Sequence, residues 1–212
     1  GFSIGDGDNV NRGPSDNIVS WNWKAGGTGS SNSNGSITST VSANTTAGFS
    51  IVSYVGTGSN ATVGHGLGVV PQMYIVKNRD YAEQWDIYFE SLGATKNLSL
   101  DSTAAAATQA SRWNNTAPTN QVFTVGTSES VNNSGDNLIA YCFAEKKGYS
   151  KIGSYTGNGN ADGPFIYTGF KPAFFLMKET TDSSTNWLMY DNKRTVAGNP
   201  NTKVLYPNLN NI

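Results

Sequence analysis

The sequence has little of what metal sites, disulfide-rich domains and many active sites depend on. Its 212 residues include one cysteine, Cys142, and one histidine, His65. A single cysteine excludes an intrachain disulfide, and one cysteine with one histidine excludes an ordinary tetrahedral zinc site. Only 14% of the residues are charged and the formal net charge is −1, so we expect no nucleic-acid partner. No apolar run reaches about 18 residues, and we expect no membrane insertion.

What the sequence does have is turn-forming residues and aromatic side chains. It contains 24 Gly, five Trp, ten Tyr and nine Phe. This aromatic content argues against disorder, despite the abundance of Asn, Ser and Thr. Short runs rich in Val, Ile and Tyr alternate with Gly, Asn and Ser turns. They predict an all-β fold, with antiparallel β-sandwich or jelly-roll-like units.

Two sequence patterns each occur twice. Residues 53–77 match residues 154–178 at a constant offset of 101. Residues 16–23, DNIVSWNW, match residues 136–143, DNLIAYCF. If the first pattern is named A and the second B, the order along the chain is B-A-B-A. We therefore predict that the β-units form a tandem duplication, which opens and closes inside the repeat.

This order divides the chain into three regions. Residues 1–47 hold the first B unit with a Gly/Ser/Thr/Asn-rich insert, residues 48–122 the first A unit, and residues 123–212 a truncated second B-A copy. The insert, residues 25–47, predicts an exposed loop or linker. The alternative is that residues 36–41, SITSTV, add an edge strand. Because the repeat is unfinished and the first residue is Gly, we expect the chain to be a piece of a longer protein.

The strand and helix signals differ in strength. In the B units the large residues alternate with smaller ones, and they are Val19, Trp21 and Trp23 in one copy and Ile139, Tyr141 and Phe143 in the other. We expect both segments to be strands that turn this face to the core. In the A units, residues 71–77 with 85–89, and residues 172–178 with 187–191, each predict a β-hairpin. Residues 101–112 are equally compatible with a short helix and an irregular loop.

Candidate catalytic and metal-binding residues are few. His65 lies in GHGLG and is not repeated in the second copy, so a turn is favoured over a catalytic histidine. Cys142 is expected to be a small buried residue rather than a nucleophile. Asp6 and Asp8 offer oxygen ligands at alternate positions, but Val10 breaks the calcium-loop pattern and a turn is favoured. No G-x-G pair completes a dinucleotide-binding motif. We expect no catalytic residue, no metal and no cofactor.

One aromatic residue is a candidate for ligand binding. Sugar sites pair an aromatic ring with amide and carboxylate groups. Trp113 lies in the polar stretch SRWNNTAPTN, outside any apolar alternation. It is a candidate platform for a carbohydrate; the alternative is a tryptophan that holds a loop against the core. Trp85 and Trp187 recur at matched positions, which favours a packing role for both.

The longest motifs carry a family resemblance. The stretches GHGLGVVPQMYIVKNRD, WNNTAPTNQVFTVG and NLIAYCFAEKKGYSKIGSYTGNGNADGPFIYTGFKPAFFLMK resemble a repeat domain of tailed-bacteriophage virion (tail-fibre-like) proteins. Such domains are often found beside concanavalin-like, laminin-G-type lectin domains. The resemblance covers residues 16–212, and the insert of residues 25–47 departs from it. The family's own function is poorly defined, so the resemblance implies a class and a location and no site residues.

The function that the resemblance implies is that of a non-enzymatic structural or adhesion module. It would belong to a tail fibre, spike or capsid decoration on the virion surface, and would associate with itself or with other virion proteins. The alternative is a glycan-binding module that recognises a host surface polysaccharide. An enzyme such as a polysaccharide depolymerase is disfavoured, because no paired carboxylates recur or stand out.

Overall fold

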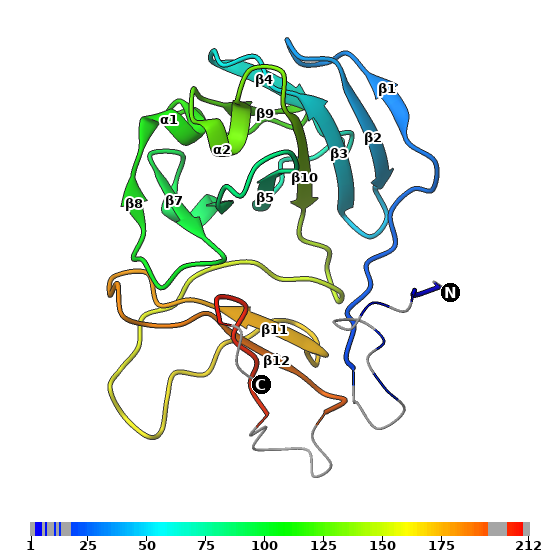
Figure 1. The fold of residues 1–212 in the computed structure, drawn as a ribbon. Coiled ribbons are helices and arrows are strands. Elements are labelled where there is room, and N and C mark those ends of the chain that lie inside the picture. Colours follow the sequence, from blue (N-terminus) through cyan, green and yellow to red (C-terminus); the bar gives the residue numbers. More distant parts are fainter. Residues whose placement is uncertain are drawn as a thin grey trace.

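The structure, a computed structural model, is built mainly from short antiparallel strands (Figure 1). It describes residues 3–5, 7, 11, 13, 18–194 and 203–209. Asp6 and Asp8, the expected acidic turn, lie outside this range. The predicted all-β class is confirmed.

An eight-stranded antiparallel sheet forms the centre of the molecule. Its strands, in spatial order, are β1 (Ser30–Asn32), β2 (Ser39–Asn44), β3 (Phe49–Val55), β10 (Asn137–Phe143), β5 (Met73–Asn78), β6 (Trp85–Phe89), β7 (Lys96–Ser99) and β8 (Ala107–Thr108). Two small sheets pair β4 (Ala61–Gly64) with β9 (Val122–Val125) and β11 (Phe174–Met177) with β12 (Leu188–Asp191). The helices are single turns: η1 (Glu90–Leu92), α1 (Ala110–Trp113) and α2 (Glu129–Asn132).

Strand β10 lies at the centre of the large sheet, although it comes last of these strands in the sequence. It pairs with β3 along its whole length and with β5 from Leu138 onward. Its small-residue face, Leu138, Ala140 and Cys142, is fully buried. Its large-residue face, Ile139, Tyr141 and Phe143, is only half-buried. The predicted core face is therefore wrong. The rings of Tyr74 and Tyr88 fill the main core beside the middle of β10, where the strand contributes only the small residues Ala140 and Cys142.

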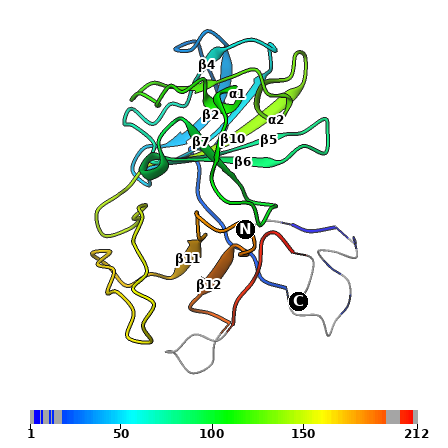
Figure 2. The same cartoon turned by 90° about the vertical axis from the view of Figure 1, so that its left-hand side faces the viewer.

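The main core lies between the large sheet and a cover made of β4, β9, α1 and α2 (Figure 2). Its centre is aromatic. The ring of Tyr74 stacks on Tyr88 with centroids 4.7 Å apart, and meets Trp113 edge-on at 4.9 Å. Phe123, from β9, lies 5.0 Å from Tyr74. Burial of rings this large dominates the stability of a core.

The hairpin β11–β12 lies on the opposite side of the large sheet (Figure 2). Trp187, just before β12, is buried there, and its indole Nε1 donates to the carbonyl oxygen of Ser99 at 2.8 Å. Its ring stacks against Phe89, and Ile87 and Leu98 complete a second, smaller core. Trp187 therefore has the packing role that its position in the repeat predicts.

Both predicted hairpins form, and they share one register. In the first, Tyr74 stands opposite Tyr88; in the second, the matched residues Phe175 and Tyr190 stand opposite each other. Beyond the hairpin the copies differ. Residues 151–173 hold no strand, although their counterparts include most of β3 and all of β4. The tandem duplication predicted from the sequence is thus not confirmed as a duplicated fold.

Two segments near the start of the chain, residues 18–23 and 25–47, also differ from the prediction. Residues 18–23, the described part of the first B segment, form no strand. The insert of residues 25–47, in contrast, is not a simple loop, because it holds β1 and β2. Strand β2 pairs with β3, with Val41 opposite Val52, and Val41 is buried. The strand predicted as the alternative exists, but shifted to Ser39–Asn44 and inside the sheet rather than at its edge.

A buried ion pair connects α1 to β6. Only the end of the ambiguous stretch 101–112 is helical, and this turn brings Arg112 Nε to 3.1 Å from Oδ1 of the fully buried Asp86. Asn97 Nδ2 donates to the same oxygen at 3.0 Å, and Ser130 Oγ donates to Oδ2. Desolvation raises the pKa of Asp86, and Arg112 and these hydrogen bonds oppose the rise.

We expect Asp86→Ala to destabilise the protein by about 3 kcal/mol, because it leaves the Arg112 cation nearly buried without its partner. Lys151→Ala is the matched control: it breaks an ion pair with Glu145 whose lysine is half-exposed, and should cost less than about 1 kcal/mol. Urea denaturation followed by tryptophan fluorescence gives both values. Equal losses in the two variants would contradict a structural role for the buried pair.

Candidate functional site

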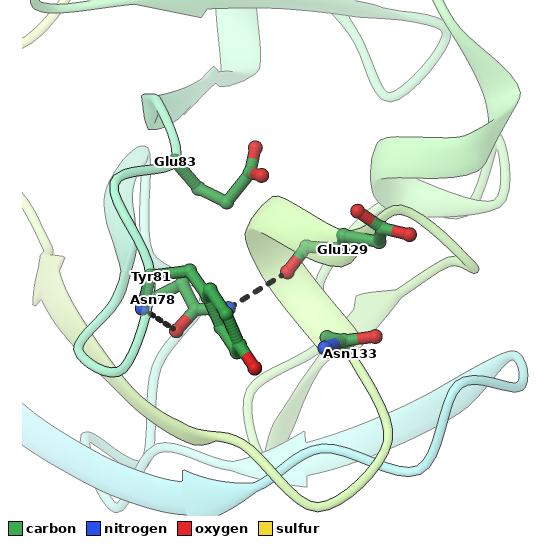
Figure 3. Close-up of a pocket in the computed structure, with 5 residues that line it drawn as sticks. All are labelled: Asn78, Tyr81, Glu83, Glu129 and Asn133. Atoms are coloured by element: carbon green, nitrogen blue, oxygen red, sulfur yellow. Dashed lines mark hydrogen bonds between the residues drawn. The ribbon is translucent and has the colours of Figure 1, made fainter.

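A small polar pocket lies where the loop between β5 and β6 faces α2 (Figure 3). It has a volume of about 260 Å³ and is lined by Asn78, Tyr81, Glu83, Glu129 and Asn133. Tyr81 and Glu83 come from the loop, Glu129 is the first residue of α2, and Asn133 follows its last. One aromatic ring, one carboxylate and two amides therefore meet at one place on the surface, and Glu129 turns its backbone carbonyl toward them while its carboxylate points away (Figure 3).

Asn78 forms the floor of the pocket and joins its two walls. Its side chain is buried at the end of β5. The Oδ1 atom accepts hydrogen bonds from the backbone N–H groups of Asp80 (2.9 Å) and Tyr81 (3.2 Å), which turns the loop back on itself. The Nδ2 atom donates to the Glu129 carbonyl (3.1 Å) and to Asp136 Oδ2 (2.7 Å).

Hydrogen bonds to the loop backbone and to Asp80 fix the rest of the loop and leave the polar side-chain groups of Tyr81 and Glu83 available to a ligand. Lys77 Nζ donates to the carbonyl oxygens of Tyr81 and Glu83. Asp80 accepts two hydrogen bonds from Asn137, and these lower the pKa of Asp80. The side chain of Tyr81 stays 63% exposed. Among the described residues, neither pocket glutamate has a hydrogen-bond partner for its carboxylate.

This set of groups suits a ligand rich in hydroxyl groups. Carboxylates accept hydrogen bonds from hydroxyls, an amide such as Asn133 both donates and accepts, and an exposed tyrosine ring offers an apolar face. Across the described ranges, no group of three or more His, Cys, Asp or Glu side chains is placed to hold a metal ion. Of the helices the structure describes, none has the length and apolar character to cross a membrane.

Trp113, the candidate carbohydrate platform, lies in the core, as in the alternative that the sequence offered. Its side chain is fully buried, with the ring edge-on to Tyr74 and Tyr88. A sugar platform needs an exposed ring face, and Trp113 has none. The polar neighbours that drew attention to it do lie on the surface: α1 ends after one turn, and Asn114 and Asn115 adopt left-handed backbone conformations (φ 47° and 50°).

Tyr81 is the aromatic residue at the pocket that the sequence reasoning missed. It lies in NRDYAEQ, which was interpreted only as the polar loop of a hairpin. The available signal was an aromatic residue between Asp80 and Glu83 in a loop with no apolar alternation. Nothing in the sequence places Glu129 or Asn133 beside it, because they come from an element some fifty residues later.

His65 and Cys142 are buried and have structural roles. His65 Nδ1 accepts from the backbone N–H of Leu67 (3.2 Å), and Nε2 lies 3.1 Å from the carbonyl oxygen of Thr119. These contacts require a neutral ring that donates from Nε2, and burial lowers the pKa of His65. Burial raises the pKa of Cys142 to about 12. This cysteine is thus a neutral thiol at physiological pH, as expected for a small core residue.

A comparison with known families accounts for the whole chain. A family described as a domain of unknown function, DUF7483, matches residues 1–212. The chain belongs to the DUF7483 family. No curated protein and no solved structure matches it. The pocket formed by the β5–β6 loop and α2 is the candidate binding site of this DUF7483 chain.

We expect the stability of this DUF7483 chain to fall as the pH drops below 6.5, the ordinary pKa of histidine. The pKa of folded His65 is lower than that of unfolded His65, so the unfolded state binds more protons in this range and is favoured. His65→Gln should be less stable at pH 8 and lose less stability between pH 7 and pH 5. Denaturation midpoints across this range test it, and parallel pH profiles for the two proteins would contradict it.

Proposed function

We propose that this chain is a non-enzymatic structural and adhesion module exposed on a phage virion, in a tail fibre, spike or capsid decoration. The motif resemblance supports the location. The buried, neutral state of His65 and Cys142 supports a role without nucleophilic catalysis by either residue. The observation that carries the proposal, however, is the exposure of aromatic side chains in the second copy of the repeat.

These aromatic side chains are large and turned to solvent. Phe165 is 89% exposed and Tyr167 is 78% exposed. Tyr155 is 50% exposed, whereas its counterpart in the first copy, Tyr54, is 4% exposed and lies in the main core. Phe165 and Tyr167 are two residues apart in the stretch of residues 151–173, which holds no strand, and large apolar side chains exposed on one segment suit a surface for interaction with another molecule. In an assembly, neighbouring subunits would cover these exposed side chains.

A second candidate function is glycan binding, and the pocket favours it. Tyr81, Glu83 and Asn133 combine an exposed ring with hydrogen-bonding groups that suit sugar hydroxyls. The pocket is small, so it fits a single sugar residue of a longer polysaccharide rather than an extended chain. Binding of a host surface polysaccharide would give the adhesion part of the proposed role its chemical basis.

The virion assignment is tested on purified particles. We expect antibodies raised against this chain to label the particle surface in immunogold electron microscopy, and peptides of the chain to appear in mass spectra of density-purified virions. Removal of loosely bound protein by a high-salt wash serves as the control. A chain that is absent from washed particles contradicts the proposal.

The glycan candidate predicts that Tyr81→Ala weakens polysaccharide binding at least about tenfold, a loss of about 1.4 kcal/mol, since the ring provides the apolar contact. A glycan array identifies the ligand, and isothermal titration calorimetry measures the affinity. Tyr149→Ala is the control, because Tyr149 is similarly exposed but lies outside the pocket. If no glycan is retained, or if the two variants bind alike, the pocket is not a glycan site.

A further inference from the structure

One edge of β11 lacks the neighbour that its counterpart has. Strand β5 is paired on both sides, with β6 and with β10. Strand β11, which matches β5, pairs with β12 in the matching register, and within the described residues its other edge has no strand beside it. An unpaired edge with free backbone donors and acceptors is a template for another strand.

A central side chain of β11 is more exposed than its counterpart on β5. In the first copy, Cys142 of β10 stands opposite Tyr74, and Tyr74 is completely buried. The counterpart of Tyr74 is Phe175, which is 42% exposed. Phe175 is therefore exposed where its counterpart is covered by Trp113 and Phe123 and has β10 beside it.

The chain also contains a strand-like segment without a sheet. Ile18–Trp23 has the alternation of β10 but forms no strand, and both of its ends are exposed. The order B-A-B-A accounts for this. The second B segment, β10, completes the first A unit, which leaves the first B segment unused and the second A unit incomplete.

The contacts of this segment indicate a register. The ring of Trp23 lies 5.3 Å from Phe174, edge-on, and that of Trp21 lies 6.0 Å from Phe174. In the first copy the matched residues, Phe143 and Met73, stand directly opposite each other. Within its own chain the segment meets β11 only through side chains, and no backbone hydrogen bond joins them among the described residues.

We propose that Ile18–Trp23 of one copy pairs with β11 of a second copy, antiparallel, with Trp23 opposite Phe174 and Asn22 opposite Phe175. In its own chain the segment forms no backbone ladder with β11 among the described residues, so the backbone groups of this edge stay available to the same segment of a second copy. The inference rests on the proposed self-associating role. Each copy offers one strand and one edge, so copies join head to tail and the contact does not close on itself.

Disulfide trapping tests the register and the source of the strand. Asn22→Cys and Phe175→Cys are placed in separate copies of different length, both with Cys142→Ala to remove the native thiol. The mixture is oxidised and separated on a non-reducing gel. We expect the mixed dimer, and several-fold less of it from Ser20→Cys with Phe175→Cys, which is two residues out of register. No mixed dimer, or equal yields from the two pairs, overturns the inference.

The double variant Asn22→Cys/Phe175→Cys distinguishes pairing within a chain from pairing between chains. A crosslinked monomer as the main product at high protein concentration overturns the inference in favour of closure within one chain. Asn22 and Phe175 are both exposed, so both variants should fold, and circular dichroism checks that they do.

Light scattering after size-exclusion chromatography gives an independent measurement on the unmodified chain. We expect oligomers whose size grows with concentration, and their loss in Trp21→Pro. In β10 the odd-numbered positions face β5, as Asn137 does when it accepts from Arg79, so in the matched register Trp21 donates to β11, and proline cannot donate to a strand ladder. A wild-type chain that stays monomeric overturns the inference. If the same chain is found on washed virions, the proposed function survives that result, so the two failures are distinguishable.

Discussion

The insertion of β10 between β3 and β5 is the constraint on which the rest of the structure depends. Strands β3 and β5 of the first A unit are not neighbours, and β10 lies between them and joins them into one sheet. In the middle of the strand it does so with small side chains, since Ala140 and Cys142 are fully buried on the sheet face that carries the stacked rings of Tyr74 and Tyr88. A larger residue at either position would displace these rings, and overpacking of a dense core is costly.

The candidate site is a consequence of the same insertion. The chain reaches β10 by way of α2 and Asp136, and Asp136 hydrogen-bonds Asn78 at the end of β5. This places α2 against the β5–β6 loop and so creates the pocket with Tyr81 on one wall and Glu129 on the other. The aromatic side chain and the α2 residues are therefore brought together by sheet topology, and no local sequence motif encodes them.

Sequence patterns predicted the features that local geometry decides. The hairpins and the all-β class follow from alternation and turn residues, and the burial of Cys142 was expected from its small size and lack of a nearby base. The core face of β10 could not be read this way, because both faces are apolar and the choice depends on how much space Tyr74 leaves. The two alternatives for Trp113 could not be separated from the sequence for a related reason: one helical turn rotates the ring into the core while its polar neighbours stay on the surface. The place of β2 in the sheet is likewise set by its pairing with β3, and β1 follows as the edge strand paired with β2.

The two copies of the A unit separate local from non-local determinants of structure. The β5–β6 and β11–β12 hairpins adopt the same register, so this part of the fold is encoded within the hairpin itself. Tyr54 and Tyr155 occupy matched positions yet differ from 4% to 50% in exposure, so their environment is not encoded locally. What differs is the presence of β10 beside Tyr54 and of Phe123 and Val131 over its ring. A β-unit whose central strand comes from elsewhere in the sequence is complete only where that strand is supplied, and this dependence is what makes such units suited to joining one another.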